Sequence, residues 1–157
     1  MATPLIAKDL PLSELTLRRY EKPSSDASER ELVRKLCLSV GLLQPGDSRD
    51  VIVDIFLVLL HARQRKEELT SEQVCSLVIE SRKTHQLALL GIAHSNVRRQ
   101  LKRLKDLFLV ENNTTTYRIP EFLPLQETFR ANVENFLLGS VMGRVKEYIA
   151  KVDEKFG

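Results

Sequence analysis

The stretch HSNVRRQLKRLKDLFLV at residues 94–110, followed at once by ENNTTTYRI at 111–119, decides which fold the chain is expected to adopt. Residues 94–105 contain no acidic side chain but hold five basic ones: Arg98, Arg99, Lys102, Arg103 and Lys105. The whole chain of 157 residues carries a formal net charge of +3, so its remainder is net negative. The positive charge is therefore local, as expected of a surface that binds an acidic partner.

The first part of this stretch predicts a helix over 95–106 with two distinct faces. Ser95 is the expected N-cap, because a serine oxygen can accept a hydrogen bond from a free backbone N–H of the first turn. Each residue turns an α-helix by about 100°, which gathers four apolar side chains on one side: Val97, Leu101, Leu104 and Phe108. The basic side chains fall on the opposite arc, so one face can pack on a core while the other stays cationic.

The second part predicts a β-hairpin. Its strands are expected at Leu107–Glu111 and Thr115–Ile119, where β-type residues recur. Between them lie Asn112, Asn113 and Thr114, and asparagine tolerates the positive φ that tight hairpin turns require.

A helix is expected near 29–40, before this stretch. Ser28 and Glu31 have the spacing of a capping box, in which each side chain bonds the backbone N–H of the other. Gly41 is the expected end of this helix.

A second upstream helix is expected near 49–66, with Asp47 or Ser48 as its cap. Its middle is apolar on nearly every side, which predicts a central place in the core. Asp54 interrupts that apolar run, and we expect it to pair with a basic residue near the core.

A third helix should begin at Thr70 or Ser71. Its apolar positions predict that Val74, Cys75, Val78 and Ile79 face inward. Residues 81–93 either extend this helix or form a short separate one, and Gly91 ends that segment.

Helix, capped helix, basic helix and hairpin follow one another over about residues 49–119, and this order resembles a winged helix-turn-helix. The residues that carry the resemblance are LTSEQV, SNVRRQLKRL and DLFLVENNTTTYRI. They are similar to bacterial and archaeal transcriptional regulators of the MarR, ArsR and TrmB types. The resemblance implies a mainly α (α+β) fold and binding to double-stranded DNA. In two respects the chain departs from the pattern: 81–93 is longer than the usual turn, and the hairpin tip lacks a basic residue.

Groove and phosphate contacts are expected from the cationic face of the third helix of this unit. The residues concerned are Ser95, Asn96, Arg98, Arg99, Gln100, Lys102 and Arg103, with Arg118 on the hairpin. The alternative is a winged-helix interaction module in which the same face meets an acidic protein in a larger complex and reads no DNA.

A long helical pattern runs from Leu125 to Phe156, interrupted in propensity by Gly139 and Gly143. About 30 residues make a helix of roughly 45 Å, which is longer than a small domain can cover. We therefore expect a homodimer through a stripe of six residues: Phe129, Val133, Phe136, Val141, Val145 and Tyr148. A helix folded back on its own domain is the alternative.

Three units are thus expected: an N-terminal extension with one helix (1–48), the winged helix-turn-helix (49–119) and a C-terminal dimerisation helix (120–157). Within the extension, residues 12–23 hold Arg18, Arg19 and Lys22. This segment is either an arm that contacts nucleic acid or a segment that packs on the domain.

Other classes of protein are not expected. Cys37 and Cys75 lie in helical patterns, which indicates free thiols and a cytoplasmic protein. The most apolar run, 51–60, is shorter than the roughly 20 residues of a membrane span. The three histidines are scattered, and no phosphate loop or nucleophile elbow occurs, so neither cofactor, metal nor catalysis is predicted.

Overall fold

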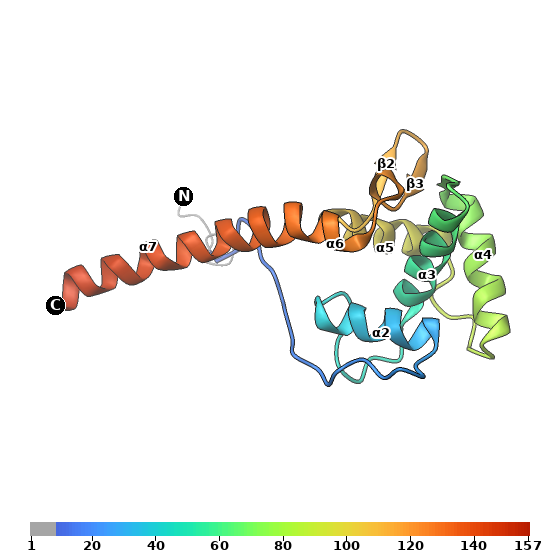
Figure 1. The fold of residues 1–157 in the computed structure, drawn as a ribbon, viewed down its shortest axis with the longest axis horizontal. Helices are drawn as coiled ribbons and strands as arrows, with labels where there is room; N and C mark the ends of the chain where they lie inside the picture. The colour runs from blue at the N-terminus through green and yellow to red at the C-terminus, as the bar shows by residue number, and fades with distance from the viewer. Residues whose placement is uncertain (1–8) are drawn as a thin grey trace, which may run out of the picture.

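The computed structural model describes residues 9–157, and residues 1–8, the start of the predicted N-terminal extension, lie outside the described part. The chain is mainly helical with a small three-stranded antiparallel sheet, which confirms the α+β class (Figure 1). In chain order the elements are α2 (Glu29–Ser39), α3 (Val51–Gln64), β1 (Leu69–Thr70), α4 (Ser71–Thr84), α5 (His94–Asp106), β2 (Glu111–Asn113), β3 (Thr116–Arg118), η1 (Pro120–Phe122), α6 (Leu125–Thr128), η2 (Phe129–Leu138) and α7 (Gly139–Phe156).

α2 begins at the predicted capping box, and Thr70, one of the two caps expected for α4, forms a second capping box. The Ser28 hydroxyl accepts from the backbone N–H of Glu31, whose carboxylate accepts from the N–H of Ser28. Thr70 and Gln73 make the same reciprocal pair at the start of α4. Gly41 follows α2 with φ +78°, and an added Cβ would lie 2.7 Å from the Cβ of Thr16, so this position requires glycine.

The other two predicted caps are wrong. Asp50 occupies the N-cap position of α3 without a side-chain capping bond, and the Asp47 carboxylate accepts from the N–H of Arg49 within the preceding turn. α5 begins one residue earlier than expected, at His94, so Ser95 lies inside the first turn and Ala93 is the N-cap. The Asp50 carboxylate is unavailable for capping because it binds arginines, as described below.

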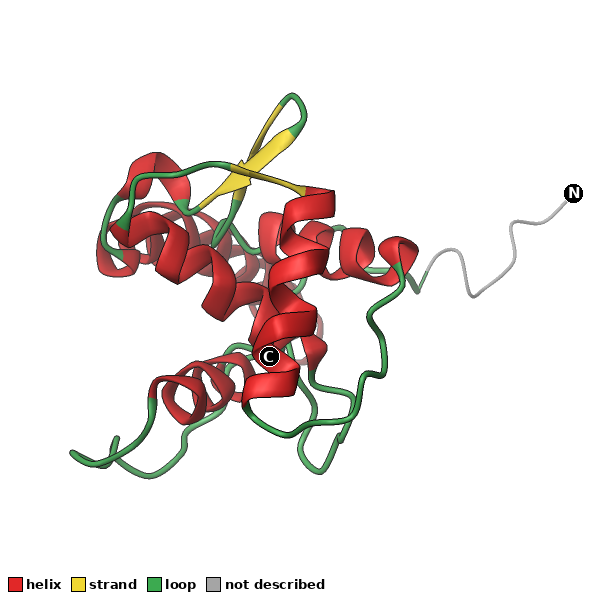
Figure 2. Cartoon of the chain, turned by 90° about the vertical axis from the view of Figure 1, so that its right-hand side faces the viewer, coloured by secondary structure: helices red, strands yellow, loops and turns green. Residues whose placement is uncertain are grey.

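α3 is the centre of the core, and α2, α4 and α5 pack around it. Val53, Ile55, Phe56 and Leu59 have no exposed surface. Figure 2 shows the hairpin projecting from this helical body. The predicted central position of this helix is confirmed.

Charged side chains meet where α2, α3 and α4 pack together: Asp50, Asp54 and Arg82 are buried and Arg30 is partly buried. Arg30 donates to Asp54 at 3.0 Å and to Asp50 at 3.1 Å. Arg82, only 4% exposed, donates to the same two carboxylates, at 2.8 Å to Asp54 and 3.1 Å to Asp50. Ser81 adds a hydroxyl bond to Asp54 at 2.9 Å, and the more exposed Arg34 lies 3.6 Å from Asp50. The expected pairing of Asp54 with basic residues is confirmed.

The segment after α4 is a loop. α4 extends to Thr84, so residues 81–84 belong to this helix and do not form a separate one. The rest is tied to the ion cluster because the Arg82 Nε donates to the carbonyl of Ala88 at 2.6 Å. Gly91 adopts φ +75° just before α5.

The sheet has the strand order β1-β3-β2. β1 lies immediately before α4 in the chain. The hairpin is confirmed but its strands are shifted from the prediction. Leu109 and Val110 are buried in the core and do not pair, so β2 starts at Glu111 and includes both asparagines. Thr114, with φ +61°, makes the turn in place of an asparagine.

α6, η2 and α7 follow one another without a break and form the expected long C-terminal helix, which extends away from the body (Figure 1). Its middle part, η2, is a π-helix of 10 residues, with wider turns than an α-helix. Among the described residues no helix has the length and apolar character that crossing a membrane requires.

Replacing Arg82 with methionine is expected to lower the free energy of unfolding by about 3–5 kcal/mol, because two buried carboxylates lose a partner. Urea denaturation followed by circular dichroism measures this. The control is Arg65→Met, since the Arg65–Glu67 pair is half-exposed and should contribute no more than about 1 kcal/mol. Equal losses in the two variants would contradict a structural role for the cluster.

The Asp50 carboxyl should also make stability depend on pH. Burial raises its pKa, but hydrogen bonds from Arg82 and Arg30 outweigh burial, so the pKa lies below its ordinary value. The stabilisation is complete above the unfolded pKa of about 3.9 and is lost as pH falls through the lower folded pKa. Unfolding free energies of the wild type should therefore decrease below about pH 4, and Asp50→Asn should show a smaller decrease over the same range.

Candidate nucleic-acid interface

The orientation of α5 is set by its apolar face. Val97, Leu101 and Leu104 have no exposed surface and pack into the core against α3 and α4. The opposite face is left to solvent: Arg98, Arg99, Lys102 and Lys105 are exposed, and Arg103 is partly buried. The two predicted faces are therefore present, except that Phe108 lies beyond the end of α5, with φ +62°, and is not part of the apolar face.

One flank of α5 borders a basic depression of about 510 Å³. Asn96, Arg99, Gln100 and Arg103 line it from the helix, and the turn between α2 and α3 lines the other side. That turn adds Arg49, an exposed cation that the sequence analysis did not select. Arg49 lies in a turn without periodicity, so only the folded chain brings it beside the helix.

Two of the expected DNA-reading side chains are already hydrogen-bonded. The Asn96 amide donates to the carbonyl of Gly91 at 2.8 Å and its oxygen accepts from Gln100 at 3.2 Å. The Gln100 oxygen accepts in turn from Arg103 at 2.8 Å. This chain of bonds joins the loop to the flank of α5, and reading a base would require some of them to exchange.

The exposed cations differ in how far neighbouring acids neutralise them. Lys102 pairs with Asp106 at 2.8 Å, an exposed pair one helical turn apart. The pKa of Glu72 at the start of α4 is lowered, mainly by a hydrogen bond from its own backbone and to a smaller extent by nearby charges that include Arg98. Within residues 9–157, Arg98 and Arg99 make no ion pair.

Arg118 is held within the sheet. Its Nε lies 2.6 Å from the Glu111 carboxylate and 3.9 Å from that of Glu68, and its guanidinium stacks over Phe122 at 5.0 Å. A contact with DNA would require breaking these interactions. The structure therefore separates Arg118 from the cationic face of α5, although the sequence analysis grouped them.

The residues expected at a dimer interface fall into two groups. Val133 is fully buried and Phe129 packs against the core, so both belong to the chain's own domain. Phe136 is 63% exposed and meets Phe108 edge to face at 6.2 Å. The remaining three lie on α7, where Val145 and Tyr148 are exposed and Val141 is partly buried.

Within residues 12–23, the part around Arg18 is bonded to the domain, whereas Leu12 is 94% and Leu17 49% exposed. Arg18 donates to the carbonyls of Leu38 and Leu43 at 2.8 and 3.2 Å and to the Gln44 side chain at 2.6 Å. These bonds fasten the N-terminal segment across the end of α2.

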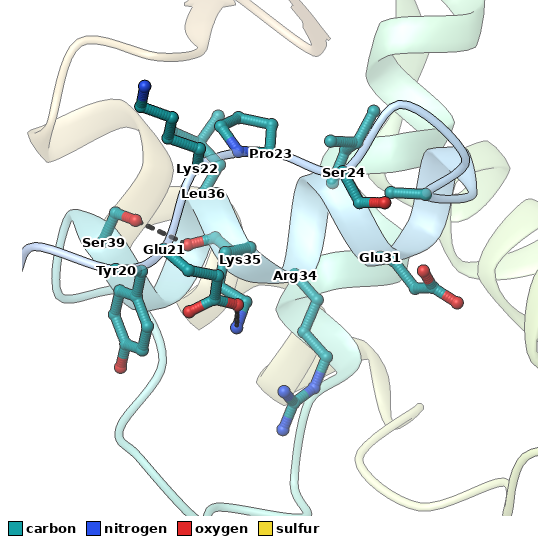
Figure 3. A pocket seen from close by; sticks show the side chains of 12 residues that line it. Tyr20, Glu21, Lys22, Pro23, Ser24, Glu31, Arg34, Lys35, Leu36 and Ser39 are labelled. Carbon is teal, nitrogen blue, oxygen red and sulfur yellow. Dashed lines mark hydrogen bonds and ion pairs between the residues drawn. The ribbon is translucent and has the colours of Figure 1, made fainter.

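A second depression, of about 560 Å³, lies between the N-terminal segment and α2 (Figure 3). Its charged groups are partly paired with each other: Lys35 binds Glu21 at 2.6 Å and lies 4.9 Å from the centre of the Tyr20 ring. The described residues contain no cluster of three side chains that would suit a metal ion, and both cysteines are buried free thiols.

Removing the Asn96 amide should loosen the start of α5. Asn96→Ala loses the bonds to Gly91 and Gln100, and we expect the free energy of unfolding to fall by about 0.5–1.5 kcal/mol. The neighbouring Ser95→Ala is the control, since this exposed residue does not cap the helix, and its change should stay within about 0.5 kcal/mol. A loss confined to Ser95→Ala in thermal or urea unfolding would contradict this assignment.

The chain matches no protein-family model, no curated protein and no solved structure. The geometry, burial and charge of α5 and its surroundings are therefore the basis for a proposed function.

Proposed function

We propose that the chain is a winged-helix protein that binds double-stranded DNA through α5 and acts as a transcriptional regulator. The order α3, β1, α4, α5, β2, β3 resembles that of a winged helix-turn-helix, in which the recognition helix enters the major groove, and this likeness supports the proposal. The sheet order β1-β3-β2 supports this comparison because the hairpin is anchored beside the start of α4.

The observation that carries the proposal is the pair Arg98 and Arg99, exposed on α5 without an ion pair among the described residues. The apolar side of α5 is fully buried, so the helix can only present its charged side outward. The major groove of B-DNA is about 12 Å wide and admits one helix. Arginine there can bind guanine through two parallel hydrogen bonds or pair with phosphate.

The remaining contacts follow from the position of each side chain. Lys102 can exchange its exposed partner Asp106 for a phosphate at little cost, because such pairs contribute little to stability. Arg103 and Arg49 border the basic depression and suit the phosphate backbone at the edge of the groove. Ser95 is exposed in the first turn, where recognition helices contact base edges.

The hairpin has a smaller part in this arrangement. Its turn is Thr114–Thr115, with no positive charge, and Arg118 at its base is neutralised by Glu111. Affinity should therefore depend on α5 far more than on the wing.

A salt titration of binding to mixed-sequence duplex DNA tests the proposal. Each phosphate neutralised contributes about −0.9 to the slope of log affinity against log salt. Replacing Arg98, Arg99 and Lys102 with alanine should therefore reduce the slope by up to roughly 2.7. Fluorescence anisotropy with a labelled duplex measures both affinity and slope.

The matched control replaces Arg65, Arg144 and Lys151 with alanine, which removes the same charge from exposed sites outside α5. Its slope should equal that of the wild type. An unbound wild type at low salt, or equal slopes in the two triple variants, would refute DNA binding through α5.

A protein-interaction module is the second candidate, and the hydrogen bonds that already occupy Asn96 and Gln100 favour it. In that case the cationic face of α5 meets an acidic protein surface. Stoichiometric capture of one protein partner that Arg98→Ala weakens, together with absent DNA binding, would favour this candidate over the first.

A further inference from the structure

α7 carries an apolar face that the described part of the chain does not cover. None of its residues from Gly139 to Phe156 is buried. Met142 and Val145 are each 47% exposed, and the exposure rises to 86% at Phe156. Apolar patches of this extent are seldom left in contact with water, so we expect a neighbour along that face.

From Leu138, the last residue of η2, and along α7, apolar positions recur with alternating spacings of four and three residues. They form what we call the seam: Leu138, Met142, Val145, Ile149, Val152 and Phe156. Such a repeat averages 3.5 residues and is the pattern of a two-stranded coiled coil, in which the seam supplies the a and d positions. Only Val145 is shared with the stripe expected from the sequence.

The side of α7 away from the seam is polar. It carries two ion pairs one turn apart, Arg144 with Glu147 and Lys151 with Glu154. Both pairs occupy outer positions of the heptad, and Ala150 lies on this side as well. The helix is therefore amphipathic in the sense that a coiled coil requires.

We propose that a second copy of this chain covers the seam and forms a parallel two-stranded coiled coil. All six seam positions are apolar, so the seam pairs with itself without leaving a polar group buried. In the heptad, Met142, Ile149 and Phe156 take the a positions, and Leu138, Val145 and Val152 take the d positions. This inference does not depend on DNA binding.

Charge at the flanking positions decides the direction. Antiparallel copies that overlap along the whole seam bring Lys146 of one against Lys146 of the other, and like charges there are unfavourable. Parallel copies bring Lys146 beside Val141 and Asp153 beside the Tyr148 hydroxyl of the second copy. The parallel pairing therefore covers the same seam without a like-charge contact.

A parallel pair places both domains at the N-terminal end of the coiled coil. The two α5 helices are then related by the twofold axis of the dimer. If α5 binds DNA, this symmetry matches two half-sites separated by about one helical turn.

Light scattering combined with size-exclusion chromatography, without DNA, tests the seam. The wild type and Ala150→Asp should be dimeric, whereas Ile149→Asp should raise the dimer dissociation constant at least about 30-fold. Circular dichroism checks that each variant is folded. A monomeric wild type, or a folded Ile149→Asp variant that dimerises as well as Ala150→Asp, would overturn the proposal.

Oxidative cross-linking of Val152→Cys tests the direction, because the two copies of this seam position lie side by side only when the helices are parallel. The native Cys37 and Cys75 are buried, and burial raises the pKa of Cys37 to about 12, so the new thiol is the reactive one. Parallel copies should give a covalent dimer at high yield, and adding Ile149→Asp should abolish it. A dimeric Val152→Cys protein that fails to cross-link would overturn the parallel arrangement.

Discussion

The buried cluster of two arginines and two aspartates is the interaction on which the rest of the structure depends. Arg30 brings α2 to it, Asp50 and Asp54 belong to the start of α3, and Arg82 comes from α4. Each arginine binds both aspartates, so removing any one member leaves the other charges with fewer partners at a largely buried site and weakens the contact among the three helices. Arg82 also binds the carbonyl of Ala88, and through the loop that follows it influences where α5 begins.

α5 has an apolar face that packs on the core and a cationic face that is exposed. Its leucines have no exposed surface and hold it rigidly against the core, while Arg98 and Arg99 remain without an ion pair among the described residues. A rigid support matters for recognition because cations on a fixed helix lose little conformational freedom on binding. The bonded amides of Asn96 and Gln100 extend this support to the flank of the helix.

Sequence reasoning succeeds where the signal is local and fails where it is not. The capping box of Ser28 and Glu31, the Thr70 cap and the buried face of α5 depend on residues within a few positions of each other, and they are predicted correctly. Asp54 was recognised as needing a cation, but its partners lie 24 and 28 residues away, so they emerge only from the fold. Leu109 and Val110 have the composition of a strand and are instead core residues, since apolar runs alone do not distinguish pairing from burial.

The wide turns of η2 separate the two uses of the C-terminal helix. Val133 within η2 is buried, whereas no residue of α7 beyond it is. Each added residue of an α-helix rotates the following side chains by about 100°, so the number of residues in this segment sets the direction in which the exposed face of α7 points. If two copies pair along the seam, a single insertion or deletion within η2 would therefore reorient the two helical bodies about the paired helices.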